Sequence, residues 1–281
     1  MLSCYYGSVN RWECDENDHL NVRFYAEKVN QAVEVFLGEV AGETGEPGRI
    51  SRQHVRYVRE CRIAAPLRVD CGLLAARGEA WDVLALMHQN LTGDPIAGFV
   101  CRVARADLGA VTAPAPAVLP EWAAPRGLDP MAPYAPPSTL AEARARGFET
   151  MGRGVIAPFE CDADGKLLPH AYIGRISDGM PNVWGLEGAD EQEATPLGGA
   201  VLEQTLDVLR PLGRGERYRH LSGIRAIGGK TLHFVHLLWN ESRDQLAARS
   251  EAIGVLMDLG ERKTVTISDA RRARLGARVI D

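Results

Sequence analysis

The sequence predicts an α+β fold that is built twice, with each half an antiparallel sheet wrapped around one long helix. Three observations lead to this expectation. A short motif occurs in both halves of the 281-residue chain. Hydrophobic residues recur at helical spacing after the first motif and are followed by strand-like runs. A proline-rich segment lies between the halves. A repeat that spans half the chain indicates an internal duplication.

The repeated motif centres on an aspartate. Residues 12–25 and 159–172 share five of fourteen positions, namely Glu, Cys, Asp, Leu and Tyr, which aligns Asp15 with Asp162 at an offset of 147 (162 minus 15). Three further pairs follow in the same order, at offsets of 145, 148 and 151: Pro66 with Pro211, His88 with His236, and Asp107 with Asp258. Four anchors in one order predict a duplication.

The domain boundaries follow from proline density. Residues 113–137 hold eight of the sixteen prolines in the chain. Proline removes a backbone donor and disfavours both helix and sheet, so this segment is expected to be an extended connector. We therefore expect a first repeat at 1–112, a linker at 113–144 and a second repeat at 145–281.

In the first half, apolar residues at three- and four-residue steps predict a helix of about five turns between Val22 and Val40. Asn17 or Asp18 is the expected cap at its start. Alternating apolar residues separated by turn residues then predict four strands. These are His54–Ala64, Leu67–Ala76, Trp81–Asn90 and Ile96–Ala106.

The second half is read with the help of the duplication. Residues 170–184 occupy the helix position, although two glycines and a proline weaken the pattern. Val201–Leu212 has helical periodicity, but the duplication aligns it with the strand around Arg62–Leu67, so a strand is expected there. The remaining expected elements are the strands Ser222–Ile227, Lys230–Asn240 and Ala248–Asp258, and a short helix at Ser268–Leu275.

The motif around Asp15 resembles a known family. It reads Asp15-x-Asn17-Asp18-His19-Leu20-Asn21-x-x-x-Tyr25 and opens a long helix. This pattern resembles the hotdog-fold acyl-CoA thioesterases of the hydroxybenzoyl-CoA thioesterase type, and two copies in one chain resemble their double-hotdog form. The segments 230–236 and 258–263 are similar to the later strands of that family. The resemblance implies two tandem hotdog repeats and hydrolysis of an acyl-CoA thioester to the free acid and CoA.

The resemblance also implies the site residues. Asp15 is expected to be catalytic, either attacking the thioester carbonyl or activating a water, beside the N–H groups of a helix N-terminus that can hold an oxyanion. His19 and Asn21 are expected to orient the substrate, the water or Asp15. In the second copy Asp162 remains, but Lys166 and Leu168 replace the histidine and the asparagine, which puts activity there in doubt.

Two other functions stay open at this stage. Enoyl-CoA hydratases and dehydratases share the hotdog fold, but their histidine follows the aspartate by five residues, and here His19 follows Asp15 by four. A non-catalytic acyl-CoA-binding module is the second alternative. Tyr25, repeated as Tyr172, is expected to pack in the core rather than take part in chemistry.

Bulk properties exclude other classes. A net charge of −5 and a pI of 5.9 argue against a nucleic-acid partner. No stretch is long and apolar enough for a membrane span, and the N-terminus lacks the pattern of a signal peptide. We therefore expect a cytoplasmic protein with reduced cysteines and an acyl-CoA substrate as its partner. A homodimer of double-hotdog chains is compatible with this expectation.

No cofactor and no metal are expected. The segment Gly152–Ala157 matches a dinucleotide-binding fingerprint, but Pro158 follows at once where a helix would have to begin, so this interpretation is rejected. His233 and His236 resemble a metal pair, but residues three apart on a strand face opposite sides.

Overall fold

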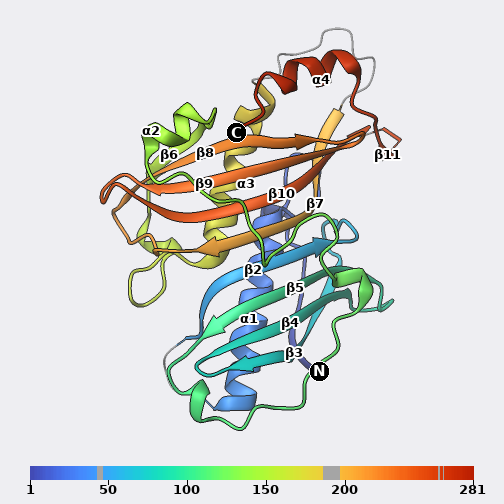
Figure 1. The fold of residues 1–281 in the computed structure, drawn as a ribbon. Helices are drawn as coiled ribbons and strands as arrows, with labels where there is room; N and C mark the ends of the chain where they lie inside the picture. The colour runs from blue at the N-terminus through green and yellow to red at the C-terminus, as the bar shows by residue number, and fades with distance from the viewer. Residues whose placement is uncertain (43–46, 186–196, 259, 262) are drawn as a thin grey trace. The chain divides into compact units, whose positions relative to one another are not determined.

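The computed structural model describes residues 1–42, 47–185, 197–258, 260–261 and 263–281. The chain forms two compact units, unit 1 (Met1–Arg126) and unit 2 (Gly127–Asp281). Each unit holds one long helix and one antiparallel sheet, which confirms the predicted fold class (Figure 1).

Unit 1 consists of a five-stranded sheet and the helix α1 (Val22–Ala41). Its strands are β1 (Leu2–Ser8), β2 (Arg49–Tyr57), β3 (Pro66–Arg77), β4 (Ala80–Gln89) and β5 (Pro95–Ala104). They pair in the order β1-β3-β4-β5-β2. The short 3-10 helices η1 (Arg11–Glu13), η2 (Leu108–Ala110) and η3 (Glu121–Ala123) lie in the connections. Helix α1 packs against β1, β3 and β4.

Unit 2 repeats this arrangement around the helix α3 (Pro169–Gly185). Its strands are β6 (Glu149–Val155), β7 (Leu197–Val208), β8 (Arg217–Ile227), β9 (Thr231–Asn240), β10 (Gln245–Asp258) and β11 (Lys263–Thr264). They pair in the order β7-β10-β9-β8-β6, and β11 pairs with β10. The 3-10 helix η4 (Pro158–Glu160) and the helices α2 (Leu140–Ala145) and α4 (Asp269–Gly276) complete the unit.

Helix α1 forms because one face of its sequence can be buried along the sheet. Tyr25, Val29, Val33 and Phe36 are all nearly inaccessible to solvent, as the helical spacing predicts. The helix begins one turn later than the expected caps, because Asn21 is the N-cap and its side chain accepts the N–H of Arg23. The prediction of Asn17 or Asp18 as the cap is therefore wrong.

The first predicted strand of unit 1 is misplaced. The sequence predicts a strand at His54–Ala64, whereas β2 runs from Arg49 to Tyr57. Residues 58–65 leave the sheet because their backbone groups bond elsewhere: Cys61 accepts the N–H of Leu20. Ala64 has a φ of 64°, in the left-handed region that ends extended structure.

The duplication is confirmed by the strand registers, with an offset that changes once. Up to the long helix the offset between equivalent residues is 147. In unit 1 the carbonyl of Cys61 accepts the N–H of Leu20, and in unit 2 the carbonyl of Leu212 accepts the N–H of Leu167. Cys61 and Leu212 are therefore equivalent, and from Cys61 onward the offset is 151 (212 minus 61). The pairs Leu67–Gln89 and Tyr218–Asn240 obey the second offset. The connection after the helix is therefore four residues longer in unit 2.

This register corrects three alignments made from the sequence. Pro66 with Pro211 and His88 with His236 are not structurally equivalent pairs, because their offsets are 145 and 148 rather than 151. The segment Val201–Leu212 corresponds to residues 50–61, not to Arg62–Leu67. The expected strand itself is confirmed as β7. Chance matches of proline and histidine produced the wrong register.

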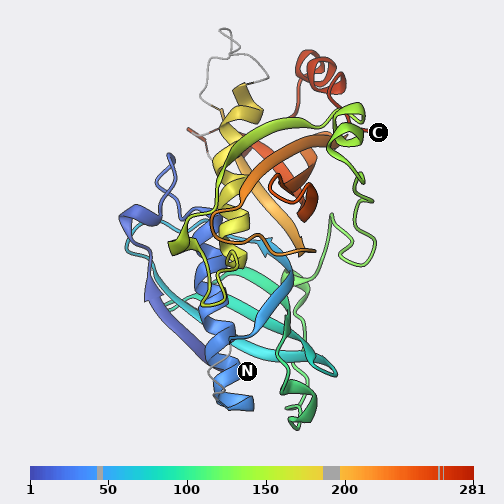
Figure 2. The same cartoon turned by 90° about the vertical axis from the view of Figure 1, so that its left-hand side faces the viewer.

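The proline-rich segment covers the sheets on the face opposite the long helix. In unit 1, Trp122 and Ala123 pack against Leu84 and Leu86 of β4. In unit 2, the backbone N–H of Tyr134 donates to Glu251 of β10 at 2.7 Å. Each unit thus has a helix on one face of its sheet and this segment on the other (Figure 2).

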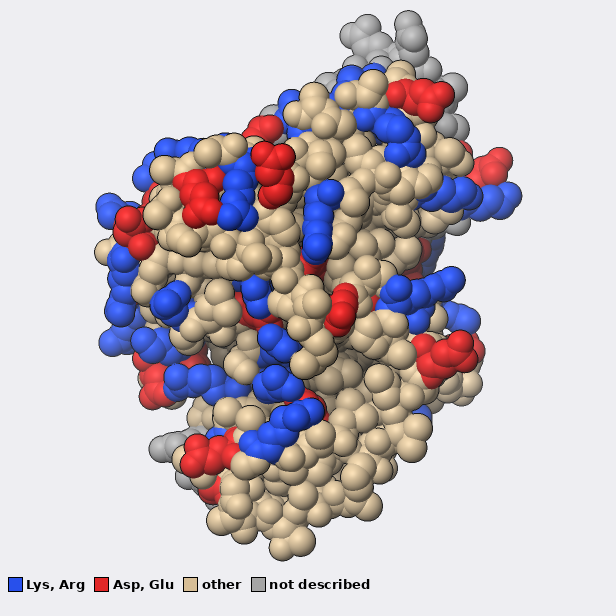
Figure 3. All heavy atoms as spheres, in the orientation of Figure 1, with Lys and Arg blue, Asp and Glu red and all other residues tan. Residues whose placement is uncertain are grey.

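Charged side chains of both signs are interspersed on the face of the molecule shown in Figure 3. This mixture agrees with the small negative net charge of the chain. Among the helices that the structure describes, none is long and apolar enough to cross a membrane.

Candidate active site

The motif around Asp15 folds into a tight turn. Cys14 and Leu20 form a β-bridge, and the N–H of Asp15 donates to the carbonyl of His19 at 2.8 Å. The Asp15 carboxylate closes the turn: its Oδ1 accepts the backbone N–H of Asn17 at 2.9 Å and that of His19 at 3.1 Å. Asp18 takes a φ of 58° to complete the reversal. The turn thus fixes the position of the Asp15 carboxylate.

His19 is brought beside a second carboxylate that the sequence analysis missed. The His19 side chain is buried, and its Nε2 lies 3.7 Å from Oε2 of Glu60, whose side chain is 43% exposed. A β-bridge between His19 and Arg62 holds the 58–65 loop against the motif. No local pattern in the sequence marks Glu60, because periodicity predicts a strand where its loop lies. The His19 imidazole and the accessible Glu60 carboxylate therefore lie next to each other in unit 1.

Asn21 and Tyr25 hold the turn to the rest of the unit. Asn21 caps α1: its side-chain Oδ1 accepts the backbone N–H of Arg23 at 3.0 Å. The Tyr25 hydroxyl accepts the N–H of Cys61 at 3.1 Å, and its ring packs edge-on against Tyr57. Burial raises the pKa of Tyr25 well above its ordinary value. Tyr25 therefore packs in the core, as expected.

The cysteine beside the site is not reactive. Burial raises the pKa of the Cys61 thiol to about 11. Because the thiolate is the nucleophilic form, a thiol that stays protonated near neutral pH is a poor nucleophile. The chemical groups at the turn are therefore the carboxylates of Asp15 and Glu60 and the His19 imidazole.

The second copy keeps the turn and its aspartate but has neither the histidine nor the glutamate. Oδ1 of Asp162 accepts the N–H of Lys166 at 2.8 Å, and the N–H of Asp162 donates to the Lys166 carbonyl at 2.8 Å. The Tyr172 hydroxyl accepts the N–H of Leu212 at 2.8 Å, as Tyr25 does in unit 1. Lys166 stands where unit 1 has His19, and Pro211 stands where it has Glu60.

A buried ion pair supports each turn, and the sequence analysis missed both pairs. In unit 1, Lys28 Nζ lies 2.6 Å from Glu13, and both side chains are almost fully buried. In unit 2, Arg175 pairs with Glu160. Both pairs obey the offset of 147, which was the signal available in the sequence. A buried charge needs such a partner, so each pair fixes its 3-10 helix to its long helix.

Two further motifs from the sequence take these positions in the structure. The segment Gly152–Gly154 lies in β6, not at the start of a helix. His233 and His236 occupy opposite faces of β9: His233 bonds to Glu251 at 2.8 Å, and His236 is buried beside His220. Among the described residues, no group of three or more His, Cys, Asp or Glu side chains can hold a metal ion.

Comparison with known proteins agrees with the duplicated fold. The family model described as Thioesterase-like superfamily matches residues 9–124 and 157–275, one region in each unit. None of the curated proteins compared matches the chain.

Three solved structures match the chain over most of its length. A protein assigned as an oleoyl thioesterase from Lactobacillus plantarum matches with a TM-score of 0.65 and 11% identity, covering 89% of this chain and 94% of that one. The acyl-ACP thioesterase from Bacteroides thetaiotaomicron matches with a TM-score of 0.62 and 12% identity, covering 89% and 96%. The 12:0-ACP thioesterase from Umbellularia californica matches with 0.63 and 13%, covering 89% and 92%. At these identities the likeness establishes a shared fold.

Proposed function

This chain belongs to the Thioesterase-like superfamily and is a thioester hydrolase, and we propose that it hydrolyses an acyl-CoA thioester to the free acid and CoA at the Asp15 turn of unit 1. One observation carries the choice of site. Unit 1 gathers Asp15, His19 and Glu60 in one place, whereas unit 2 has the same turn with Lys166 and Pro211.

The proposed roles follow from the hydrogen bonds. Because Oδ1 of Asp15 accepts two backbone N–H groups, the position of its carboxylate is fixed. Such a carboxylate is suited to holding the attacking water. The His19–Glu60 pair accepts the proton as the water oxygen bonds to the thioester carbonyl carbon. The C–S bond then breaks, and the departing thiolate takes a proton from His19.

Asn21 and Asp162 receive different roles in this proposal. Asn21 acts on the site through the helix, because its side chain caps α1 and so fixes the chain that leaves the turn. Asp162 keeps the same turn in unit 2 and serves structure rather than chemistry. Direct attack of Asp15 on the thioester is the other route that a carboxylate offers. A single turnover in H₂¹⁸O would reveal it by placing the label in Asp15.

The carrier of the acyl group is a second choice that needs a test. CoA is the carrier implied by the motif's resemblance, while two of the structures with the same fold are named as thioesterases for acyl groups on ACP. A panel that presents the same acyl groups on CoA and on ACP distinguishes these carriers by the ratio of their kcat/KM values.

A thiol-release assay with this panel tests the proposed site through matched substitutions. His19→Asn should lower kcat by about 10²-fold or more, the loss typical of removing a general acid–base group. Lys166→Asn, at the equivalent position of unit 2, should leave kcat within about twofold of wild type. Equal effects of the two substitutions, or no effect of the first, would remove the Asp15 turn as the active site.

A further inference from the structure

A row of polar side chains crosses the helix-facing side of the unit 2 sheet. His220 and Ser222 lie on β8, His236 on β9 is paired with Ser222, and Ser250 on β10 is paired with His236. All four are buried, with exposures between 0% and 4%. Polar groups at such depth cost free energy unless they are hydrogen-bonded.

The fold itself does not require this row. At the offset of 151, the equivalent positions of unit 1 hold Val69, Cys71, Ala85 and Phe99, all of which are fully buried. Unit 1 thus forms the same sheet with apolar side chains at these four positions. The polar side chains of unit 2 therefore need an explanation other than stability.

Helix α3 is shaped to accommodate the row. A Cβ atom at Gly179 would lie 2.4 Å from Nδ1 of His220, so only glycine fits there. The equivalent position of α1, at the offset of 147, is Ala32. The helix and the sheet of unit 2 both differ from unit 1 at the place where the imidazole is held.

Two atoms of the row lack a protein partner within the described part of the chain. His220 Nε2 lies 3.3 Å from His236 Nδ1, and Ser250 Oγ accepts the side-chain N–H of Gln204 at 3.2 Å. Ser222 Oγ and His220 Nδ1 have none. A buried polar atom without a partner costs about 1–3 kcal/mol, and a ligand can supply the missing hydrogen bond.

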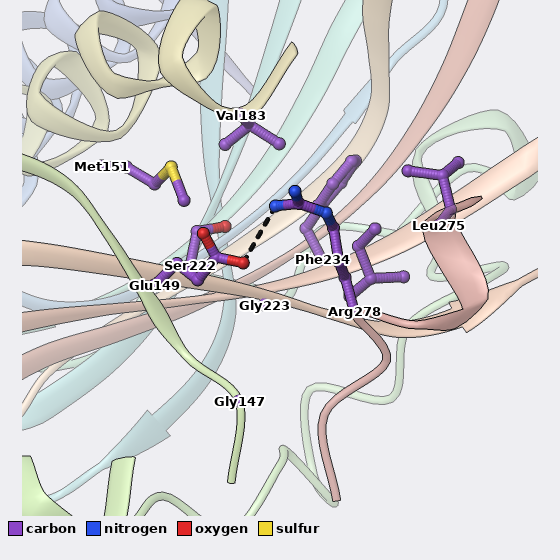
Figure 4. Close-up of a pocket in the computed structure, with 10 residues that line it drawn as sticks. Gly147, Glu149, Met151, Val183, Ser222, Gly223, Phe234, Leu275 and Arg278 are labelled. Atoms are coloured by element: carbon purple, nitrogen blue, oxygen red, sulfur yellow. Dashed lines mark hydrogen bonds and ion pairs between the residues drawn. The ribbon is translucent and has the colours of Figure 1, made fainter. Parts of the chain in front are cut away.

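Ser222 lines a pocket within unit 2 (Figure 4). The enclosed part of the pocket is small, about 30 Å³, and it opens into a larger space of about 360 Å³ that includes solvent. Its walls are mainly apolar and come from β6, α3, β8, β9 and α4: Met151, Val183, Ile224, Phe234 and Leu275. Glu149 and Arg278 also line the pocket; they are paired at 2.9 Å, and their side chains are partly exposed.

We propose that this pocket binds a short-chain carboxylic acid that carries a hydroxyl or oxo group. The apolar walls suit a hydrocarbon chain, and the modest volume limits its length. Ser222 Oγ bonds to the oxygen substituent on the chain. Arg278 provides a guanidinium for the carboxylate of the free acid. The binding of a free acid does not depend on the proposed hydrolysis.

Isothermal titration calorimetry on the full chain tests this site with 3-hydroxyhexanoate and hexanoate. Wild type should bind the hydroxy acid about tenfold more tightly, the effect of one hydrogen bond. Ser222→Ala should abolish this preference. Ser250→Ala is the matched control, because Ser250 belongs to the same row but does not line the pocket, and it should keep the preference. Glu149→Gln should tighten binding of both acids by freeing Arg278 from its ion pair.

Four results would overturn the proposal: no saturable binding of either acid, an unchanged preference in Ser222→Ala, weaker binding in Glu149→Gln, or unaltered binding in Leu275→Trp, which fills the pocket. Calorimetry needs no turnover, so failure of the proposed function is detected separately.

Discussion

The two units share one framework and differ in the chemistry placed on it. Both close a turn with an aspartate carboxylate, Asp15 or Asp162, and both tie that turn to a following loop through a tyrosine hydroxyl. Unit 1 adds His19 and Glu60 at the turn, whereas unit 2 adds buried polar groups inside its sheet.

The comparison separates residues that make the fold from residues that can make function. Features present in both copies, such as the aspartate in the turn, the tyrosine and the buried ion pair, are sufficiently explained by structure. Features present in one copy need another reason, because the other copy folds without them. By this criterion Asp15 alone does not separate a catalytic role from a structural one. His19 and Glu60, which unit 2 lacks, are the stronger indication of a catalytic site.

The largest expected effect tests the shared framework. Lys28→Met leaves the Glu13 carboxylate buried without its partner and should lower the free energy of unfolding by about 3–5 kcal/mol. Arg175→Met should cost a similar amount, because the Glu160 side chain that remains is 2% exposed against 9% for Glu13. Urea unfolding followed by circular dichroism measures both. A loss below about 1 kcal/mol for Lys28→Met would contradict a supporting role for the pair.

A smaller effect is expected on catalysis from substituting Glu60, which has no counterpart in unit 2. Glu60→Gln should lower kcat by about 10²-fold, because an amide cannot accept the proton that the water loses. Since Glu60 is partly exposed and makes its described contact with the His19 side chain, the stability should change little. Steady-state thiol release and thermal unfolding measure the two quantities. Normal kcat with an intact fold would exclude Glu60 from the reaction.

The smallest expected effect concerns acid sensitivity, which only the interior of unit 2 should show. Burial lowers the pKa of His220 from 6.5 to about 3, and burial together with His220 and His233 lowers that of His236. The folded state therefore binds fewer protons than the unfolded state between about pH 6.5 and 3, so stability is full above 6.5 and is lost as the pH falls. For His220 alone the loss at pH 5 is on the order of 2 kcal/mol.

A double substitution isolates this contribution from the carboxylates that titrate in the same range, including Glu251 beside His233. His220→Val with Gly179→Ala installs the unit 1 residues at both positions. The difference in unfolding free energy between pH 7 and pH 5 should shrink in this variant. An unchanged pH dependence would mean that His220 does not carry the acid sensitivity.

The sequence predicts the framework better than the site. Both long helices and the four main strands of each half follow from periodicity and from the duplication. The alignment of His88 with His236 is wrong, because identical residues need not occupy equivalent positions in the two sheets. Only the backbone pairing of the strands reveals that the offset changes after the helix. Glu60 is invisible from the sequence for a related reason: the loop that holds it was assigned to a strand.

The interior of unit 2 escapes prediction in another way. The sequence marks His236 only as one of two histidines three residues apart on a strand. That Ser222, His236 and Ser250 lie side by side follows from the pairing of three strands, which the sequence does not show. Ser222 carries no local signal, because an isolated serine in a strand is ordinary. Only the packing of α3 and the neighbouring strands shows that its hydroxyl is buried and lines a pocket.

The most direct test of the account compares kcat/KM for Asp15→Asn and Asp162→Asn with an acyl thioester that the wild type hydrolyses. Both aspartates accept a turn N–H through Oδ1, so the two substitutions should perturb the fold to a similar extent. Asp15→Asn should lower kcat/KM by about 10²-fold or more, and Asp162→Asn should leave it within about threefold of wild type. A larger loss from Asp162→Asn would contradict the assignment of catalysis to unit 1.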